Sequence, residues 1–176
     1  GYQGVGGIAY IGSFGTSIDT PAFVFSRGYS LVKDVAEAVS HEVGHTLGLS
    51  HDGRTSPSEG YYNGHGTGAT SWAPIMGVGY GREVVQWSRG EYAGASNPED
   101  DLAIITSGNG FGYRPDDAGD TVTAARDVGS LGVSATTFVG MIEQNTDVDV
   151  YSFTTPGSLR VTVSPAAVGA NLDVLA

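Results

Sequence analysis

The sequence predicts an α+β fold in two parts: a region of helices and short strands over residues 1–112, and a region of strands over residues 128–176. Three observations carry this prediction. Residues 30–48 form the one segment with strong helical periodicity, short apolar runs flank it, and the chain becomes polar and aperiodic over residues 113–127. Because glycine contributes 28 of the 176 residues, tight turns are expected in place of long helices.

The first elements expected are two short strands, residues 6–14 and 21–26, each bounded by turn-forming residues. A helix over residues 30–48 follows, with Ser30 as its expected N-cap. Its apolar side chains recur at helical spacing and are expected to face the core, which would fix the rotation of the helix. These side chains are Val32, Val35, Ala36, Val39, Val43 and Leu47.

Loops and one further helix are expected after this point. Residues 53–71 are rich in Gly, Ser and Thr and read as a surface loop, and residues 82–94 contain large aromatic side chains that would line a cleft or fill the core. A second helix is predicted over residues 97–107, with Asn97 as its cap and Pro98 in its first position.

The polar segment 113–127 is interpreted as a linker. Beyond it, strands are predicted over residues 136–143, 147–155 and 158–164, the last of which alternates apolar and polar side chains. A closed β-sandwich needs about seven strands, so this second part is expected to be incomplete.

Charge and composition exclude several classes of partner. The formal net charge is −11 and Lys33 is the only lysine, so no basic surface for nucleic acid is expected. The sequence has no apolar run long enough to cross a membrane and no basic amphipathic helix to lie on one. Because it contains no cysteine, disulfides and thiolate metal ligands are excluded as well.

The segment with the most chemical information is HEVGHTLGLSHD, residues 41–52, which holds three of the four histidines. On a helix, His41 and His45 lie one turn apart, so both imidazoles leave the same face. Gly48 can end the helix in a left-handed conformation, and the chain can then bring His51 back towards the other two rings. Three imidazoles leave a fourth tetrahedral position for water, which is typical of a catalytic zinc site.

Glu42 lies beside these histidines and is expected to act as general base on the zinc-bound water, then as general acid on the leaving amine. A bare H-E-x-x-H can occur by chance, but the added glycine and third histidine make chance a poor explanation. His65 is interpreted as a loop histidine and not as a fourth ligand. A zinc peptidase whose third ligand is a distant glutamate would need Glu59 or Glu83, and His51 argues against that class.

Met76 lies among turn-forming residues after this motif. Its thioether would form a hydrophobic floor beneath the imidazoles without being a ligand, although a core methionine in a loop is the alternative interpretation.

These residues resemble the metzincin family of zinc endopeptidases, and the His-Asp ending of residues 41–52 is most similar to the adamalysin or reprolysin branch. Met76 occupies the place of the Met-turn of that family. Val78 stands where some metzincins carry a tyrosine that reaches the metal, so Tyr80 is given no catalytic role. The resemblance implies that residues 1–112 are the latter part of a catalytic domain, with edge strands, zinc-binding helix, Met-turn and C-terminal helix, and that the chain is a fragment of a longer precursor.

The tail resembles a second family. Residues 147–153, DVDVYSF, and residues 169–173, GANLD, are similar to the β-sandwich domains of the pre-peptidase C-terminal type. Such domains are appended to bacterial secreted peptidases. The resemblance implies that residues 128–176 are the start of such a domain and that the protein is bacterial and secreted, although no signal peptide is visible.

The function implied is that of a zinc metalloendopeptidase, a monomeric hydrolase with one catalytic Zn²⁺ that cleaves polypeptides. In metzincins a strand upstream of the zinc helix pairs with the extended substrate, although an ordinary strand paired on both sides is the alternative here. The residues in the matching place are Ile8, Ala9, Tyr10, Ile11 and Gly12. An inactive metzincin-like protein that binds peptides, or a fragment that binds surfaces through its β-sandwich tail, are the competing functions.

Calcium is a further expectation, because carboxylates are hard oxygen ligands. Solvated surface acids are the alternative, since no EF-hand spacing is present. The candidate ligands are Asp116, Asp117 and Asp120 in the linker and Asp147 and Asp149 in the tail.

Overall fold

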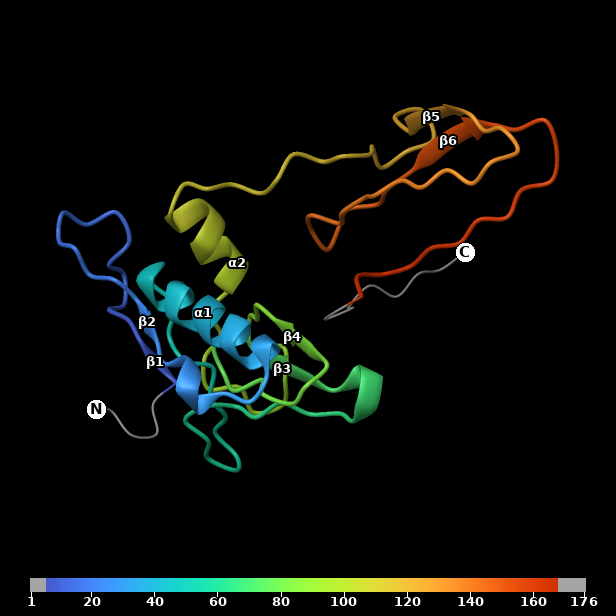
Figure 1. Ribbon diagram of the computed structural model, residues 1–176. Helices are drawn as coiled ribbons and strands as arrows, with labels where there is room; N and C mark the ends of the chain where they lie inside the picture. Colours follow the sequence, from blue (N-terminus) through green and yellow to red (C-terminus); the bar gives the residue numbers. More distant parts are fainter. Residues whose placement is uncertain (1–5, 168–176) are drawn as a thin grey trace. The chain divides into compact units, whose positions relative to one another are not determined.

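The computed structural model describes residues 6–167 of the chain (Figure 1). The contacts divide it into a first unit, Gly1–Phe111 with Pro165–Ala176, and a second unit, Gly112–Ser164. The fold mixes few helices with small two-stranded sheets, which confirms the predicted α+β class. Among the described residues, none of the helices has the length and apolar character needed to span a membrane. The tail motif at residues 169–173 lies outside the described residues.

The first unit is organised around helix α1 (Val32–Thr46), which packs against strands β1 (Gly7–Ile8) and β2 (Phe23–Val24) (Figure 1). The two strands form a short antiparallel pair that precedes the helix in the chain. Both lie within the predicted strands but are much shorter. After β1 the chain remains attached to the end of α1, because the backbone N–H of Gly12 donates to the carbonyl of His45 at 2.8 Å.

Helix α1 differs from prediction at its start and in its buried face. It begins after Leu31 without a side-chain cap, so the prediction of Ser30 as N-cap is wrong. The predicted apolar stripe is wrong too: Val32 is 88% exposed, and Val39 and Val43 are 45% and 42% exposed. The residues that are buried are Asp34, Ala38, Glu42, Gly44 and His45.

Apolar periodicity shows that a helix has an apolar face, but a face is buried only where another segment of the chain packs against it. On its buried face, α1 meets the turn that follows β3 (Trp72–Pro74): His41 hydrogen-bonds to the carbonyl of Ile75, and Gly44 lies against Met76. Strand β3 forms a parallel pair with β4 (Val84–Gln86). Backbone carbonyls of this first unit accept hydrogen bonds from the imidazoles on that face, so the polar side chains can be buried there.

Beneath α1 lies a small core of fully buried side chains. Leu49 and Met76 are both 0% exposed and are among the largest fully buried residues, and Ala73 is 0% exposed beside them in β3. Met76 lies in the turn that connects β3 to β4, in agreement with the turn predicted there.

The C-terminal part of the first unit contains α2 (Asp101–Ala103), continued by the π-helical turn η3 (Ile104–Gly108). This confirms a helical segment within residues 97–107. Asn97 is not its cap, however: Asp100 is the N-cap, and its carboxylate accepts the N–H of Ala103 at 3.0 Å. The side chain of Asn97 instead accepts the N–H of Glu99 at 3.0 Å, which makes a turn ahead of the helix and delays its start. The short 3₁₀ turns are η1 (Ser26–Gly28) and η2 (Gly68–Thr70).

The second unit contains one parallel pair, β5 (Arg126–Ser130) with β6 (Tyr151–Thr154). Strand β6 lies within the predicted strand 147–155, whereas β5 begins in the segment interpreted as a linker. Residues 136–143 and 158–164 are not strands in the described part of the chain, so those two predictions are wrong. A strand needs a partner edge for its backbone hydrogen bonds, and an apolar pattern does not provide one. That residues 128–176 begin a sandwich domain stays a prediction.

Candidate metal centre

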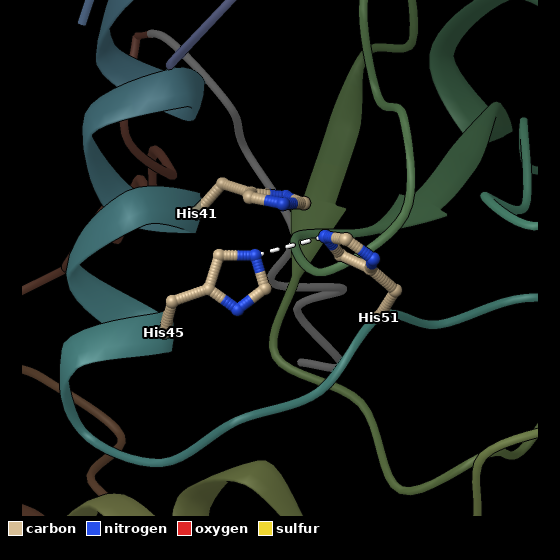
Figure 2. A group of neighbouring side chains, drawn as sticks. All are labelled: His41, His45 and His51. Carbon is tan, nitrogen blue, oxygen red and sulfur yellow. Dashed lines mark hydrogen bonds between the residues drawn. The ribbon is translucent and has the colours of Figure 1, made fainter. Parts of the chain in front are cut away.

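Three imidazoles converge on one point of the first unit. Figure 2 shows His41 and His45 projecting from α1 towards His51, which reaches them from the loop after the helix. The ring centroids are 4.8 Å apart for His41 and His45, 4.6 Å for His45 and His51, and 5.3 Å for His41 and His51. One nitrogen from each ring lies within 4.8 Å of the others, so the three residues can hold one metal ion.

The loop that carries His51 is fixed on both sides. The predicted left-handed turn is confirmed at Gly48, which has a φ of 104°. The chain then turns back, and the N–H of Ser50 donates to Glu99 Oε2 at 2.9 Å. On the other side of His51, the N–H of Asp52 donates to the carbonyl of Met76 at 2.9 Å. The position of the third imidazole is therefore set by two anchored neighbours.

Backbone carbonyls set the protonation of the two helical imidazoles. His41 Nδ1 lies 2.8 Å from the carbonyl oxygen of Ile75, and His45 Nδ1 lies 2.8 Å from that of Leu49. A carbonyl oxygen can only accept, so Nδ1 carries the hydrogen and Nε2 keeps a lone pair. Metal-binding histidines are commonly oriented by such a second hydrogen bond.

A short contact closes the group: His45 Nε2 and His51 Nε2 form a hydrogen bond of 2.9 Å (Figure 2). Two ligand nitrogens of a tetrahedral zinc ion lie about 3.3 Å apart, given Zn–N distances of about 2.0–2.1 Å. The two rings therefore need to separate by a few tenths of an ångström. His51 would also lose or relocate the shared proton, as metal binding to histidine requires.

Burial favours the neutral form of two of these imidazoles, those of His41 and His51. It lowers the pKa of His41 to about 4, which the neighbouring rings of His45 and His51 reinforce and the hydrogen bond to Ile75 opposes. Burial also lowers the pKa of His51, with His45 as a second cause. Neutral imidazole nitrogens without cysteine or carboxylate partners suit zinc among the common divalent ions.

Met76 lies directly against the helix between the first two histidines. A Cβ atom placed on Gly44 would come within 2.7 Å of Met76 Sδ and 3.1 Å of Trp87 Cζ3. Only a glycine therefore lets the thioether approach this turn of α1 so closely. The structure places Met76 against Gly44, the residue before His45, and its role as a floor beneath the imidazoles stays a prediction.

An open cleft of about 480 Å³ runs past the three histidines and Glu42. Of the predicted substrate strand, Ile8, Ala9 and Ile11 line it, whereas Tyr10 and Gly12 do not. Tyr10 is 70% exposed. Glu42 is 7% exposed at the cleft floor, and burial raises the pKa of its carboxyl group.

Several residues of this cleft were missed in the sequence. Gly7 is one: a Cβ there would lie 2.5 Å from both Cγ and Oε1 of Glu42, so the glutamate rests on the bare backbone of β1. Tyr61 is another, with its ring centroid 4.3 Å from that of His51. Tyr80 also lines the cleft, and its hydroxyl lies 3.0 Å from the hydroxyl of Tyr29. The glycine pair at the start of the first predicted strand, Gly6 and Gly7, was the only signal for Gly7. The tyrosines gave none, because an aromatic residue in a polar loop can serve many purposes.

Two other candidates turn out to be structural. His65 hydrogen-bonds through Nδ1 to the hydroxyl of Tyr62 at 3.1 Å and is not among the residues that can share the metal. Tyr92 is buried, stacks on Tyr62 at 4.3 Å and donates its hydroxyl to the carbonyl of Gly53. It fills the core and does not line the cleft.

The carboxylates considered for calcium separate into two groups in the second unit. Asp116, Asp147 and Asp149 bring oxygen atoms within 4.8 Å of one another. Asp117 instead forms an ion pair with Arg126, and Asp120 accepts the N–H of Val148 at 3.2 Å. Calcium binding at the group of three stays a prediction.

Comparison with known proteins supports a metallopeptidase origin for the start of the chain. The family described as metallo-peptidase family M12B, reprolysin-like, matches residues 1–52, which include all three histidines and Glu42. No curated protein and no solved structure matches the chain significantly. The match covers less than a third of the chain, so it speaks for the metal centre and not for the second unit.

Proposed function

We propose that this chain is part of a zinc-dependent endopeptidase of the metzincin type. The observation that carries the proposal is the convergence of three imidazoles beside a buried glutamate in an open cleft. The resemblance of residues 1–52 to reprolysin-like metallopeptidases supports it. His41, His45 and His51 would hold the ion, and Met76 would support their rings from below.

When bound, the zinc ion would supply Lewis-acid chemistry, polarising the peptide carbonyl and making a water molecule acidic. The carboxylate of Glu42 takes the proton of the attacking water and then donates it to the nitrogen of the leaving amine. Burial raises the pKa of Glu42, which makes its carboxylate a stronger base towards the attacking water. The hydrogen bonds to Ile75 and Leu49 keep two of the rings in place during this cycle.

The substrate proposed is a polypeptide in extended conformation. It would lie along β1 and the residues that follow, from Ile8 to Gly12, and pair with their backbone. Backbone pairing tolerates many sequences, which suits an endopeptidase. Monomeric action in a bacterial extracellular setting, with residues 128–176 as the start of an appended β-sandwich, is part of the same proposal and rests on the sequence resemblance.

The test is the change Glu42→Gln, which keeps the shape of the side chain but removes the base. Turnover of a quenched peptide substrate is expected to fall about 10²–10⁴-fold, while zinc bound per chain stays unchanged. Glu83→Gln is the matched control, because Glu83 is exposed and absent from the cleft lining.

Turnover by Glu42→Gln equal to that of the unaltered chain would overturn the role of Glu42. Stoichiometric zinc without any cleavage by the unaltered chain would instead favour the competing function, a metzincin-like protein that binds peptides. Cleavage that survives complete removal of zinc would contradict the proposal altogether.

A further inference from the structure

Tyr61 is an aromatic residue of the cleft that lies beside the metal centre. Its ring centroid is 4.3 Å from that of His51 and 6.4 Å from that of His41. The side chain lines the same open cleft as the three histidines and Glu42, and it is 45% exposed. A molecule that enters the cleft therefore meets Tyr61 next to two of the three potential metal ligands.

Backbone hydrogen bonds hold Tyr61 in this place. The next residue, Tyr62, donates its N–H to the carbonyl of Asp52 at 2.7 Å. The carbonyl of Tyr62 accepts the N–H of Val78 at 3.0 Å. Because Asp52 follows His51 in the chain as Tyr62 follows Tyr61, one backbone hydrogen bond anchors both aromatic residues. The position of Tyr61 relative to the third histidine is thus a property of the fold.

The hydroxyl group of Tyr61 has no hydrogen-bond partner within residues 6–167. Neighbouring tyrosines differ in this respect. The hydroxyl of Tyr80 lies 3.0 Å from that of Tyr29, and the hydroxyl of Tyr62 lies 3.1 Å from His65 Nδ1. A tyrosine hydroxyl that is exposed and has no protein partner is left to water or to a bound molecule.

Neutral hydrogen-bond donors are scarce among the side chains that line this cleft. Apart from the three histidines and Glu42, the described lining consists of glycines, aliphatic residues and two tyrosines, Tyr61 and Tyr80. The hydroxyl of Tyr80 is shared with Tyr29, and Val78 has no donor in its side chain. Tyr61 therefore carries the one unengaged hydroxyl of the described lining.

Peptide hydrolysis creates a need for such a donor. When water adds to the scissile carbonyl, an electron pair moves onto the carbonyl oxygen, which becomes negatively charged. A donor that is already in place stabilises this charged oxygen more than it stabilises the neutral carbonyl of the substrate. The interaction therefore accelerates the reaction without tightening the binding of the substrate.

We propose that the hydroxyl of Tyr61 donates a hydrogen bond to the oxygen of the scissile carbonyl as that oxygen becomes negatively charged. Tyr61 keeps its proton throughout, and the proton of the attacking water goes to Glu42. This inference rests on the proposed endopeptidase function and adds a catalytic residue to it. The family resemblance does not supply the role, since the tyrosine of some metzincins would stand at Val78.

The test is Tyr61→Phe in the full chain loaded with one equivalent of zinc, because this change removes the hydroxyl and keeps the ring beside His51. The kcat for a quenched peptide is expected to fall about 10²–10³-fold, with KM within about twofold and zinc per chain unchanged. Tyr62→Phe is the matched control. It makes the same change at the next residue, whose hydroxyl contacts His65 and which is absent from the cleft lining, so kcat should be retained.

Binding of a phosphinic peptide gives a readout that does not depend on turnover. Its tetrahedral phosphinate resembles the charged state of the reaction, and such analogues bind through the interactions that stabilise that state. Calorimetry should show that Tyr61→Phe weakens phosphinate binding by about the same factor as it lowers kcat/KM. Binding of the intact substrate, measured in the Glu42→Gln chain, should be the same with and without Tyr61→Phe.

Full kcat in Tyr61→Phe would overturn the inference, and so would equal phosphinate affinity in the two chains. A higher KM with unchanged kcat would overturn it too, because Tyr61 would then only form a wall that binds substrate. Zinc that is lost together with turnover would mean that the hydroxyl serves the metal instead. Failure of the proposed function looks different: the unaltered chain loaded with zinc would not cleave, or Glu42→Gln would cleave equally fast.

Discussion

Three histidines in the first unit and three aspartates in the second form the groups of potential metal ligands that can be compared within residues 6–167. In the histidine group, His41 and His45 each use Nδ1 to bind a backbone carbonyl, which directs Nε2 towards the other rings, where that of His45 meets His51 Nε2. In the aspartate group, two of the three members already accept backbone hydrogen bonds: Asp116 from the N–H of Ala118 at 2.8 Å, and Asp147 from the N–H of Glu143 at 2.8 Å.

The comparison shows that proximity of ligand atoms does not by itself define a metal site. A neutral imidazole whose Nδ1–H is engaged has one lone pair and few uses for it inside a protein. A carboxylate has several lone pairs and can satisfy itself with neighbouring N–H groups or water. The histidine group is therefore the better candidate for binding a metal ion, and the aspartate group is the weaker one.

The largest effect expected is on zinc binding. His45→Ala removes a buried ligand that is 6% exposed, and zinc affinity should fall by more than about 100-fold, since losing even a group that only orients a ligand costs 10–100-fold. The matched change in the other cluster, Asp149→Ala, should leave zinc per chain unchanged. Metal analysis after dialysis against a weak chelator measures the zinc content of both variants. Equal zinc loss in the two would contradict the assignment of zinc to the histidine group.

A smaller effect, on turnover, is expected when a methyl group is added to a glycine that contacts an acidic side chain: Gly7 contacts Glu42, and Gly140 contacts Asp149. Gly7→Ala places a methyl group on the carboxylate of Glu42, and a displacement of about 1 Å can lower turnover by about 100-fold. In the second unit, Gly140→Ala would press on Asp149, since a Cβ there would lie 2.7 Å from Asp149 Oδ2.

Turnover number and zinc content separate these two variants. Gly7→Ala should retain zinc but lose turnover, and Gly140→Ala should change neither by more than about twofold. If Gly7→Ala keeps full turnover, the position of Glu42 does not depend on the bare backbone of β1.

The smallest effect concerns the aromatic ring beside the third histidine. Tyr61→Ala removes the ring that lies 4.3 Å from His51, a contact of about 0.5–1.5 kcal/mol, so zinc affinity should weaken about 2–10-fold. Tyr61→Phe keeps the ring and should bind zinc like the unaltered chain. Competition titration with a zinc-sensitive dye distinguishes them, and a loss on Tyr61→Phe would mean that the hydroxyl, and not the ring, supports the site.

The candidate metal centre could be located from the sequence because nearly all the information is local. His41 and His45 belong to one helix, and Gly48 with a short loop returns His51 to them, so helix geometry and one glycine conformation are sufficient. The partners that fix the rings were not foreseeable. The carbonyls of Ile75 and Leu49, and the fit of Met76 against Gly44, depend on how a later segment packs against α1.

The sequence by itself determined which three histidines can hold a metal ion, the existence of α1 and the mixed fold class. Tertiary structure alone decided which face of α1 is buried, which apolar runs find a strand partner, and that Tyr61 lies beside His51. The physical reason is that helix spacing and glycine conformation are properties of neighbouring residues. Burial and strand pairing depend instead on contacts with residues that are distant in the sequence.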